Sequence, residues 1–332
     1  MTSVSVPSKK RVVVTYPMSE ALLEPLTQVC DVFVLPASES LQASSLIGPN
    51  VHGILCLLTD TIDGHLLSRL PDLEFVSSVS VGVDHIDVQA LSDKGVAIGN
   101  TPGVLVDATA ETAFALLLAA ARRVPEADRF VRDGLWQPEN RWSPDFFLGK
   151  QVSGSTLGIV GMGAIGQAVA TRGQAFAMDV IGWTPSGREV AGIESVSFDA
   201  LLARSDFLSV HVALVDATRN LLSAENIAKM KSGAVLINTA RGGIVDEQAL
   251  FESLRTGHLF AAGIDVFASE PVEPENPLLT LDNVVLTPHI GSATATTRSQ
   301  MLRLALENAV AATAGQPMAH CVNPQVYTPA RD

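Results

Sequence analysis

Cysteine is scarce in this chain, which has only Cys30, Cys56 and Cys321 among its 332 residues. The three lie far apart in the sequence, whereas disulfide frameworks and zinc sites both need clustered ligands. We therefore predict no disulfide framework and no bound metal. Cys56 lies in the apolar stretch "GILCLLTD", where a small buried hydrophobic residue is expected.

Basic residues are also few. The chain has 22 Lys and Arg against 35 Asp and Glu, a formal net charge of −13. A protein that binds nucleic acid needs a basic surface to displace counterions from the phosphates, and an anionic membrane surface makes a similar demand. The charge balance therefore argues against both kinds of partner.

Long hydrophobic runs are missing as well. The longest, "AFALLLAAA" at residues 113–121, is too short to span a bilayer. Residues 1–11 lack the apolar centre of a signal peptide. Together with the low cysteine count, these features predict a cytoplasmic protein.

The chain does have a regular alternation of short β-branched runs and helical patterns. Strands separated by helices are typical of βαβ crossovers, so the sequence predicts an α/β protein with parallel sheets. Near-continuous apolar strands suit a sheet that is covered on both faces. The candidate strands span residues 11–16, 31–36, 52–58, 74–79, 95–100, 155–161, 179–184, 207–212, 234–239, 261–266 and 283–288.

These strands form two sets of five or six, which predicts two domains of unequal size. The segment 100–111, "NTPGVLVDATAE", is the expected crossing point, because a Pro-Gly turn precedes residues that favour a helix start. We expect one long helix from about Thr109 to Asp133 after it.

A glycine-rich motif indicates nucleotide binding. Gly161, Gly163 and Gly166 form G-x-G-x-x-G between an expected strand and an expected helix. In that context the first glycine allows a tight turn, the second lets a pyrophosphate approach the backbone, and the third lets the helix pack on the strand. Because other nucleotide-binding proteins use related loops, the motif predicts a dinucleotide or a nucleoside ligand.

The strand after this motif lacks the expected acid. NAD-binding enzymes usually end it with a carboxylate that binds the ribose hydroxyls and repels a 2′-phosphate. Here "VIGWTPSGRE" offers Thr184, Ser186 and Arg188 instead. Loss of the repulsion and gain of donors favour NADP(H), with NAD(H) as the alternative. In the alternative reading, Arg188 is only a solvated loop residue.

Four polar residues follow other strands at the edge where a cofactor's reactive ring would lie. They are Arg241, Asp265, Glu270 and His289. Each alone has an ordinary structural explanation, but together they suit hydride transfer to a keto acid. Arg241 could bind a carboxylate in forked geometry, and His289 could give a proton to the developing alkoxide near neutral pH. Glu270 would hold the imidazole and favour its protonated form.

Four motifs in this order, "GIVGMGAIGQAVA", "INTARGGIVDEQAL", "GIDVFASEP" and "TPHIGSAT", resemble the D-isomer-specific 2-hydroxyacid dehydrogenases. The resemblance covers nearly the whole chain. Within that family, "ILCLLTDTID", "SSVSVGVDHID" and "HIGSATATTRSQM" are most similar to the glyoxylate/hydroxypyruvate reductases.

The resemblance implies a role for individual residues. Arg241, Glu270 and His289 would be the catalytic set. The substrate would contact Leu58, Thr59, the backbone amides of Val81 and Gly82, and Trp142 from a neighbouring subunit. The cofactor would contact Thr109, Gly161, Gly163, Ala164, Ile165, Gly166, Thr184, Ser186, Arg188, Thr239 and Asp265.

The resemblance also implies the architecture. A discontinuous, flavodoxin-like catalytic domain would comprise residues 1–106 and 292–332, with a Rossmann-type NAD(P)-binding domain at 107–291 between them. The long helix and the loop 136–150 would build a homodimer. The chain departs from the family at Ala213, where a proline is usual, and this puts cofactor contacts on the adenosine side in question.

The sequence thus predicts a reductase that transfers hydride from NADPH to a small 2-keto acid. Hydroxypyruvate and glyoxylate, giving D-glycerate and glycolate, are the favoured substrates, and another 2-keto acid is the alternative. Val81 argues against a phosphite dehydrogenase, which has lysine there, and Glu270 argues against a formate dehydrogenase, which has glutamine. A nucleotide-sensing protein similar to the C-terminal-binding co-repressors is the rival from another class.

Overall fold

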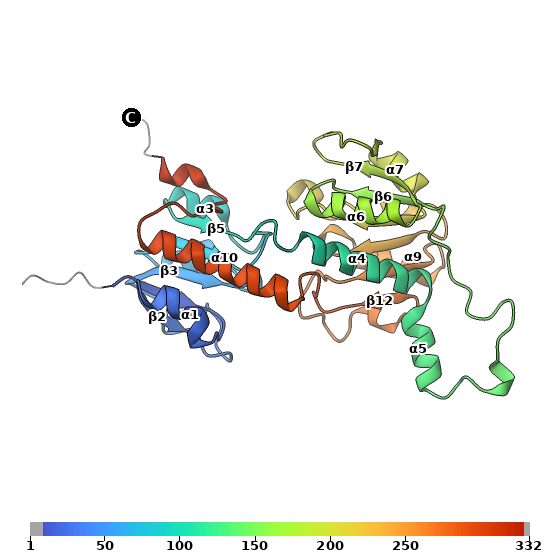
Figure 1. Ribbon diagram of the computed structural model, residues 1–332, viewed down its shortest axis with the longest axis horizontal. Coiled ribbons are helices and arrows are strands. Elements are labelled where there is room, and N and C mark those ends of the chain that lie inside the picture. The colour runs from blue at the N-terminus through green and yellow to red at the C-terminus, as the bar shows by residue number, and fades with distance from the viewer. Residues whose placement is uncertain (1–8, 329–332) are drawn as a thin grey trace, which may run out of the picture. The chain divides into compact units, whose positions relative to one another are not determined.

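The computed structural model describes residues 9–328. The chain divides into two compact units, Met1–Val104 with Ala295–Asp332, and Leu105–Thr294. Each unit contains one parallel sheet with helices packed against it (Figure 1). The predicted α/β class with two parallel sheets is confirmed. Residues 1–8 and 329–332, at the ends of the predicted catalytic domain, lie outside the described residues.

The first unit has a five-stranded sheet in the order β2-β1-β3-β4-β5, with all pairs parallel. This order is that of flavodoxin-like folds. The strands are β1 (Arg11–Val14), β2 (Asp31–Val34), β3 (Val51–Cys56), β4 (Phe75–Ser78) and β5 (Ala97–Gly99). The helices are α1 (Glu20–Thr27), α2 (Gly64–Ser68), α3 (Val88–Asp93), α10 (Ala295–Thr313) and the 3₁₀ turn η5 (Pro324–Tyr327).

The late part of the chain packs against this first sheet. Helix α10 packs on β3, β4 and β5, and α1 packs beside α10. The buried Asn323 accepts a hydrogen bond from the amide of Ile98 in β5 at 2.8 Å and donates to the carbonyl of Val96 at 2.9 Å. Residues far apart in the sequence are therefore joined in one core.

The second unit has a seven-stranded parallel sheet in the order β12-β11-β10-β9-β6-β7-β8. Its strands are β6 (Thr156–Val160), β7 (Asp179–Trp183), β8 (Glu194–Ser195), β9 (Phe207–Val210), β10 (Val235–Asn238), β11 (Ala261–Ile264) and β12 (Val284–Leu286). Its helices are α4 (Val106–Ala121), α5 (Val124–Arg132), α6 (Ala164–Ala175), α7 (Phe198–Arg204), α8 (Ala224–Ala228) and α9 (Glu247–Arg255). Its 3₁₀ turns are η1 (Pro138–Asn140), η2 (Asp216–Thr218), η3 (Gly242–Ile244) and η4 (Pro277–Thr280).

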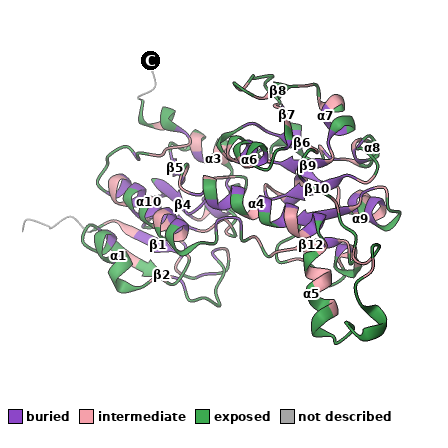
Figure 2. Cartoon of the chain, turned by 45° about the vertical axis from the view of Figure 1, so that its right-hand side comes forward, coloured by how far each residue is buried: buried purple, intermediate pink, exposed green. Residues whose placement is uncertain are grey.

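Helices cover both faces of this second sheet. Helices α4 and α6 lie side by side on one face, where Leu117 and Val169 join the core. On the other face, α7, α8 and α9 contribute residues such as Leu201 and Leu250. The strands between the two layers are buried, whereas no residue of α5 is buried and most of the segment after it is exposed (Figure 2).

Each of the predicted strand ranges overlaps an observed strand, but the predicted helix from Thr109 to Asp133 is wrong. The chain forms α4 and α5 instead, and Arg123 between them has a left-handed backbone with φ 54°. Pro125 has no N–H, and its ring would clash with the carbonyl of Ala121 in a continuous helix. The amide of Lys150 donates a hydrogen bond to the carbonyl of Ala121 at 2.7 Å, which stabilises the break.

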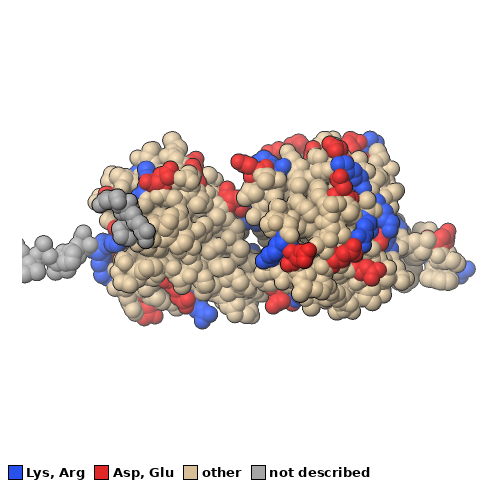
Figure 3. Space-filling model, turned by 90° about the horizontal axis from the view of Figure 1, so that it is seen from above, with Lys and Arg blue, Asp and Glu red and all other residues tan. Residues whose placement is uncertain are grey.

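The surface carries both signs of charge. Acidic and basic side chains lie next to one another on the face that Figure 3 shows. Arg172 of α6 contacts Asp107 and Glu111 of α4 at 3.1 and 3.4 Å, for example. Among residues 9–328, no helix is both long enough and apolar enough to cross a membrane.

Candidate functional site

The three glycines after β6 meet three different local conditions. Gly161 has φ +97°, and a Cβ there would lie 2.6 Å from the carbonyl oxygen of His211. At Gly166 a Cβ would overlap the carbonyl oxygen of Gly161. At Gly163, which has an ordinary backbone conformation, a Cβ would meet nothing within 4 Å. The protein itself therefore requires the first and third glycines, and the second borders open space.

This open space belongs to a cavity of about 360 Å³ at the carboxyl ends of β6, β7 and β9. The strand order reverses between β6 and β9, and such switch points are where open α/β sheets bind ligands. Helix α6 begins there without a side-chain cap, so its first amides are available to an anion. The cavity is lined by Gly161, Met162, Gly163, Thr184, Pro185, Ser186, Arg188, His211, Val212, Ala213, Val215 and Thr218.

The loop after β7 gives this cavity a basic border. None of the described residues that line the cavity is acidic, and Arg188 is basic. The Arg188 guanidinium donates to the carbonyl of Met162 in the glycine-rich loop at 2.6 Å. The hydroxyl of Thr184 donates to the Arg188 carbonyl at 3.3 Å. The predicted residues Thr184, Ser186 and Arg188 are therefore gathered at one end of the cavity.

His211 is a cavity residue that the sequence analysis missed. It follows β9, and its Nε2 lies 2.7 Å from the hydroxyl of Ser209. Some surface of the residue is exposed, but burial lowers the pKa of its imidazole to about 3, so the ring is neutral at physiological pH. The signal for it was the polar pair Ser209 and His211 in an otherwise apolar strand end next to the glycine-rich strand.

Arg241 lies at the carboxyl end of β10, at the start of η3. The glycine after it lets two loops meet, because a Cβ at Gly242 would overlap the backbone of Phe267. That contact brings the Arg241 turn against the segment that leads to Glu270. The positive charge of Arg241 is close enough to contribute to the lowered pKa of Glu270.

Glu270 and His289 form the central pair of the site. The Glu270 Oε2 lies 2.7 Å from His289 Nδ1, and Oε1 accepts from the amide of Phe267 at 2.9 Å. Burial raises the pKa of Glu270, but the hydrogen bonds from His289 and Phe267 and the nearby positive charges outweigh it. The net pKa of Glu270 lies below its ordinary value. The carboxylate is therefore ionised beside the imidazole.

Asp265 lies beneath this pair and is fully buried. Its carboxylate accepts from the hydroxyl of Thr287 at 2.6 Å and from the amides of Ile290 and Gly291, both at 2.8 Å. Its carbonyl accepts from the amide of His289 at 2.8 Å. These bonds hold His289 at φ 53°, a left-handed conformation that non-glycine residues rarely adopt.

Two threonines border the same region. Thr109 in α4 lies near the position that a Cβ of Gly291 would occupy, 3.5 Å away at its methyl carbon. Thr239, directly after β10, is buried, and its hydroxyl has no hydrogen-bond partner among the described residues. A buried hydroxyl without a partner is costly, so a ligand that accepts or donates there would be favoured.

The predicted substrate residues of the first unit lie at the carboxyl edge of its sheet. Leu58 and Thr59 form the turn after β3, where Asp60 accepts from the amide of Leu57 at 2.8 Å. Val81 and Gly82 lie in the loop after β4. Since β3 and β4 are parallel neighbours, the two loops lie next to each other.

Trp142 lies in the segment that follows α5, and its side chain is 78% exposed. The later part of this segment is held against α5, because Phe146 and Phe147 pack on Phe130 with ring centroids 5.8 and 5.1 Å away. Among the described residues of one chain, Trp142 makes no hydrogen bond, ion pair or ring contact with Glu270 or His289.

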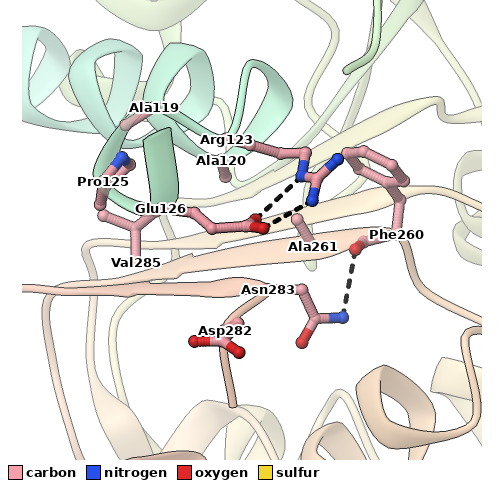
Figure 4. A pocket seen from close by; sticks show the side chains of 10 residues that line it. All are labelled: Ala119, Ala120, Arg123, Pro125, Glu126, Phe260, Ala261, Asp282, Asn283 and Val285. Atoms are coloured by element: carbon pink, nitrogen blue, oxygen red, sulfur yellow. Dashed lines mark hydrogen bonds and ion pairs between the residues drawn. The ribbon is translucent and has the colours of Figure 1, made fainter. Parts of the chain in front are cut away.

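A second cavity of about 310 Å³ lies at the opposite, amino-terminal ends of β11 and β12 (Figure 4). Alanine, proline and valine side chains form much of its wall. Its charged residues are paired, because Arg123 is bonded to Glu126 at 2.6 and 2.9 Å and Asp282 contacts Arg129 at 3.3 Å. This cavity therefore lacks the reactive groups of the carboxyl edge. Within residues 9–328, no group of three or more His, Cys, Asp or Glu is placed to hold a metal ion.

Known proteins with similar sequences and structures come from one enzyme family. Residues 114–291 match the profile of the family "D-isomer specific 2-hydroxyacid dehydrogenase, NAD binding domain". The chain is 44% identical over 325 residues to a glyoxylate reductase of Aeropyrum pernix, covering 96% of this chain and 97% of that one. It is 46% identical over 270 residues to glyoxylate/hydroxypyruvate reductase B of Yersinia enterocolitica, covering 80% and 82%. The structure of an NADPH-dependent glyoxylate/hydroxypyruvate reductase of Sinorhizobium meliloti in complex with NADP and malonate superimposes with a TM-score of 0.85. It is 31% identical and covers 96% of this chain and 98% of that one.

Proposed function

Because this chain belongs to the D-isomer-specific 2-hydroxyacid dehydrogenases, we propose that it reduces hydroxypyruvate and glyoxylate with NADPH. The coarser description, a nicotinamide-dependent reductase of 2-keto acids, follows from the family and its glyoxylate reductase relatives. The products would be D-glycerate and glycolate. The contact between Glu270 and His289 beside Arg241 carries the proposal, because it supplies the proton and the positive charge that this reaction needs.

The cavity after β6 fits a dinucleotide. Open space at Gly163, the uncapped start of α6 and the unpartnered hydroxyl of Thr239 are features that a bound cofactor would explain. The reduced nicotinamide would supply a hydride to the carbonyl carbon of the substrate. We propose residues 107–291 as the NAD(P)-binding domain, with cofactor contacts also at Thr109 and Asp265.

His289 is the proposed proton donor. Its Nδ1 faces the ionised Glu270, so Nε2 is the nitrogen that remains for the substrate. As the carbonyl carbon accepts hydride, its oxygen gains negative charge and takes the proton from Nε2. Glu270 keeps the proton on Nδ1 and stabilises the imidazolium before transfer. A proton from solvent then restores the charged imidazole.

The substrate carboxylate needs its own partners. We propose that Arg241 binds it in forked geometry and polarises the neighbouring carbonyl. The amides of Val81 and Gly82 would bind it as well, with Leu58 and Thr59 lining the pocket. Residues 1–106 and 292–332 would then form the substrate-binding domain.

The preference for NADPH rests on charge. The cavity border has Thr184, Ser186 and Arg188 where a carboxylate would repel a 2′-phosphate. The Arg188 guanidinium already lies over the glycine-rich loop through its bond to Met162. An NADPH-dependent relative of known structure supports the same preference.

We also propose a homodimer. The segment after α5 exposes Trp136 and Trp142 by 61% and 78%, an unusual exposure for tryptophan in a monomer. In the dimer, Trp142 would reach the substrate pocket of the neighbouring subunit.

Initial rates test the proposal directly. We would measure hydroxypyruvate and glyoxylate reduction with NADPH and with NADH on one preparation, and on the His289→Gln variant. We expect turnover with a preference for NADPH, and a loss of about a hundred-fold or more in His289→Gln with NADPH binding retained. Equal use of NADH would refute the cofactor preference. NADPH binding without turnover of any 2-keto acid would favour the nucleotide-sensing alternative.

Arg188→Ala tests the cofactor preference separately. We expect it to weaken NADPH binding by about ten-fold while NADH binding stays unchanged, because only NADPH carries the extra phosphate. Arg255→Ala is the matched control, since Arg255 lies on α9 and pairs with Glu252. Equal loss for both cofactors in Arg188→Ala would contradict a contact with the 2′-phosphate.

A further inference from the structure

The loop after β4 has three consecutive carbonyl groups that are all bonded to nearby donors. The carbonyl of Ser80 accepts from the amide and the hydroxyl of Thr101, at 2.8 and 3.1 Å. The carbonyl of Val81 accepts from Asn100 Nδ2 at 2.9 Å. The carbonyl of Gly82 accepts from the hydroxyl of Ser80 at 2.8 Å. The orientation of each peptide plane in this loop is therefore fixed.

The direction of the amides follows from that of the carbonyls. In a trans peptide, the C=O of one residue and the N–H of the next point in opposite directions. The bond from Asn100 to the Val81 carbonyl thus directs the Gly82 N–H away from Asn100. Thr101 directs the Val81 N–H in the same manner. Within residues 9–328, neither amide has a hydrogen-bond acceptor.

Asn100 is itself held on both sides by the late part of the chain. Its amide donates to the carbonyl of His320 at 3.1 Å, and its carbonyl accepts from Asn308 Nδ2 at 3.0 Å. Asn308 lies in α10, is 1% exposed, and also accepts from the amide of His320 at 3.3 Å. Hydrogen bonds on both sides therefore fix the backbone of Asn100, which directly follows β5.

We propose that Asn100 is a positioning residue that orients the Gly82 N–H for the substrate carboxylate. The inference rests on the proposed function, because a 2-keto acid supplies that carboxylate. The carboxylate does not react, so the amide binds it equally in the ground state and in the transition state. Loss of such binding raises KM and leaves kcat nearly unchanged.

The test compares Asn100→Ala and Asn100→Asp with the wild type. Asn100→Asp keeps the shape of the side chain and removes the donor, so it carries the test even if Asn100→Ala folds poorly. We expect the KM for hydroxypyruvate to rise by about ten-fold or more in both variants, the effect of one hydrogen bond to a charged group. The kcat should change by less than about three-fold, and the Kd for NADPH should stay the same.

Asn323→Ala is the matched control. Asn323 lies in the same unit and is 1% exposed, so it is more buried than Asn100. It bonds to Ile98, Val96 and Ser92, but among the described residues it makes no hydrogen bond to the 80–82 loop. It should lower Tm without changing KM. A KM rise of similar size in Asn323→Ala would show that general loosening of the unit suffices, and would overturn the inference.

Calorimetric titration with oxalate separates this inference from the proposed function. Oxalate carries the carboxylate but undergoes no reduction, so its binding in the presence of NADPH does not depend on turnover. We expect Asn100→Asp to weaken oxalate binding about ten-fold or more. Wild-type affinity in that variant would overturn the role of Asn100. Oxalate binding without reduction of any 2-keto acid by the wild type would instead refute the proposed activity.

Discussion

Replacement of single glycines by alanine in the loop after β6 would separate the needs of the protein from those of the cofactor. Gly163 has φ −70°, which alanine adopts freely, and an added methyl group would meet nothing within 4 Å. At Gly166 the same methyl group would overlap the backbone carbonyl of Gly161. Two substitutions of identical chemistry, three residues apart, should therefore have opposite consequences.

The expected magnitudes follow from these surroundings. Without cofactor, Gly163→Ala should change the free energy of unfolding by less than about 1 kcal/mol, because the gain in chain rigidity offsets a slightly poorer helix cap. Gly166→Ala should lose about 1–3 kcal/mol or more by overpacking, since a backbone atom cannot move aside easily. For a domain of this size, each kcal/mol lowers Tm by about 2–4 °C. NADPH affinity should fall about ten-fold or more in Gly163→Ala, because the methyl group would occupy the expected pyrophosphate position.

The assay is thermal unfolding without cofactor, together with NADPH titration by fluorescence. Gly48→Ala serves as a control, because Gly48 also borders open space but lies in the other unit. It should leave both Tm and NADPH affinity unchanged. Full NADPH affinity in Gly163→Ala would refute the placement of the pyrophosphate. A drop in Tm equal to that of Gly166→Ala would refute the distinction between the two glycines.

Three further predictions concern the polar residues of the second unit. Glu270→Gln removes the carboxylate that faces His289 Nδ1, so kcat should fall at least about ten-fold while NADPH binding is retained; an unchanged kcat would contradict the pairing. Asp265→Asn places an N–H donor among the amides of Ile290 and Gly291, so kcat should fall at least about ten-fold with the first unit unaffected; retained kcat would contradict the role of Asp265 in holding His289. The pKa of His211, which partial burial lowers to about 3, lies below its unfolded value, so the unfolded chain binds the extra proton between these two values. Stability should therefore fall with decreasing pH between about 6.5 and 3, by at most about 1.4 kcal/mol per pH unit from this group, and urea unfolding of His211→Asn across that range should lack this component.

The strands could be predicted from the sequence because each is short, apolar and β-branched, and because the alternation with helices repeats. The two-residue strand β8 could not, since Glu194 and Ser195 are exposed and carry no hydrophobic pattern. The break between α4 and α5 was indicated locally by Pro125, but the apolar run before it suggested continuity. What stabilises the break is the distant amide of Lys150, and such a contact is not visible in a local pattern.

The same limit applies to the candidate site. Arg241, Glu270 and His289 were predicted because polar residues at the carboxyl ends of parallel strands gather at one edge. His211 was missed because its partner is Ser209, and the hydrogen bond between them exists only in the folded strand end. Asp265 was expected beside the nicotinamide, but its occupied carboxylate can be recognised only when the loop 287–291 is folded around it. Short-range chemistry is readable in the sequence, whereas hydrogen bonds across loops are not.

The discontinuity of the first unit has a consequence for biosynthesis. Residues 105–294 are continuous, so the seven-stranded sheet can form while the ribosome is still adding the rest of the chain. The five-stranded sheet must wait, because α10 covers one of its faces and Asn323 binds along β5. A chain that ends at residue 294 should thus protect its second unit from protease and leave the first unit open to cleavage. The unit whose strands are translated first is therefore the unit that finishes folding last.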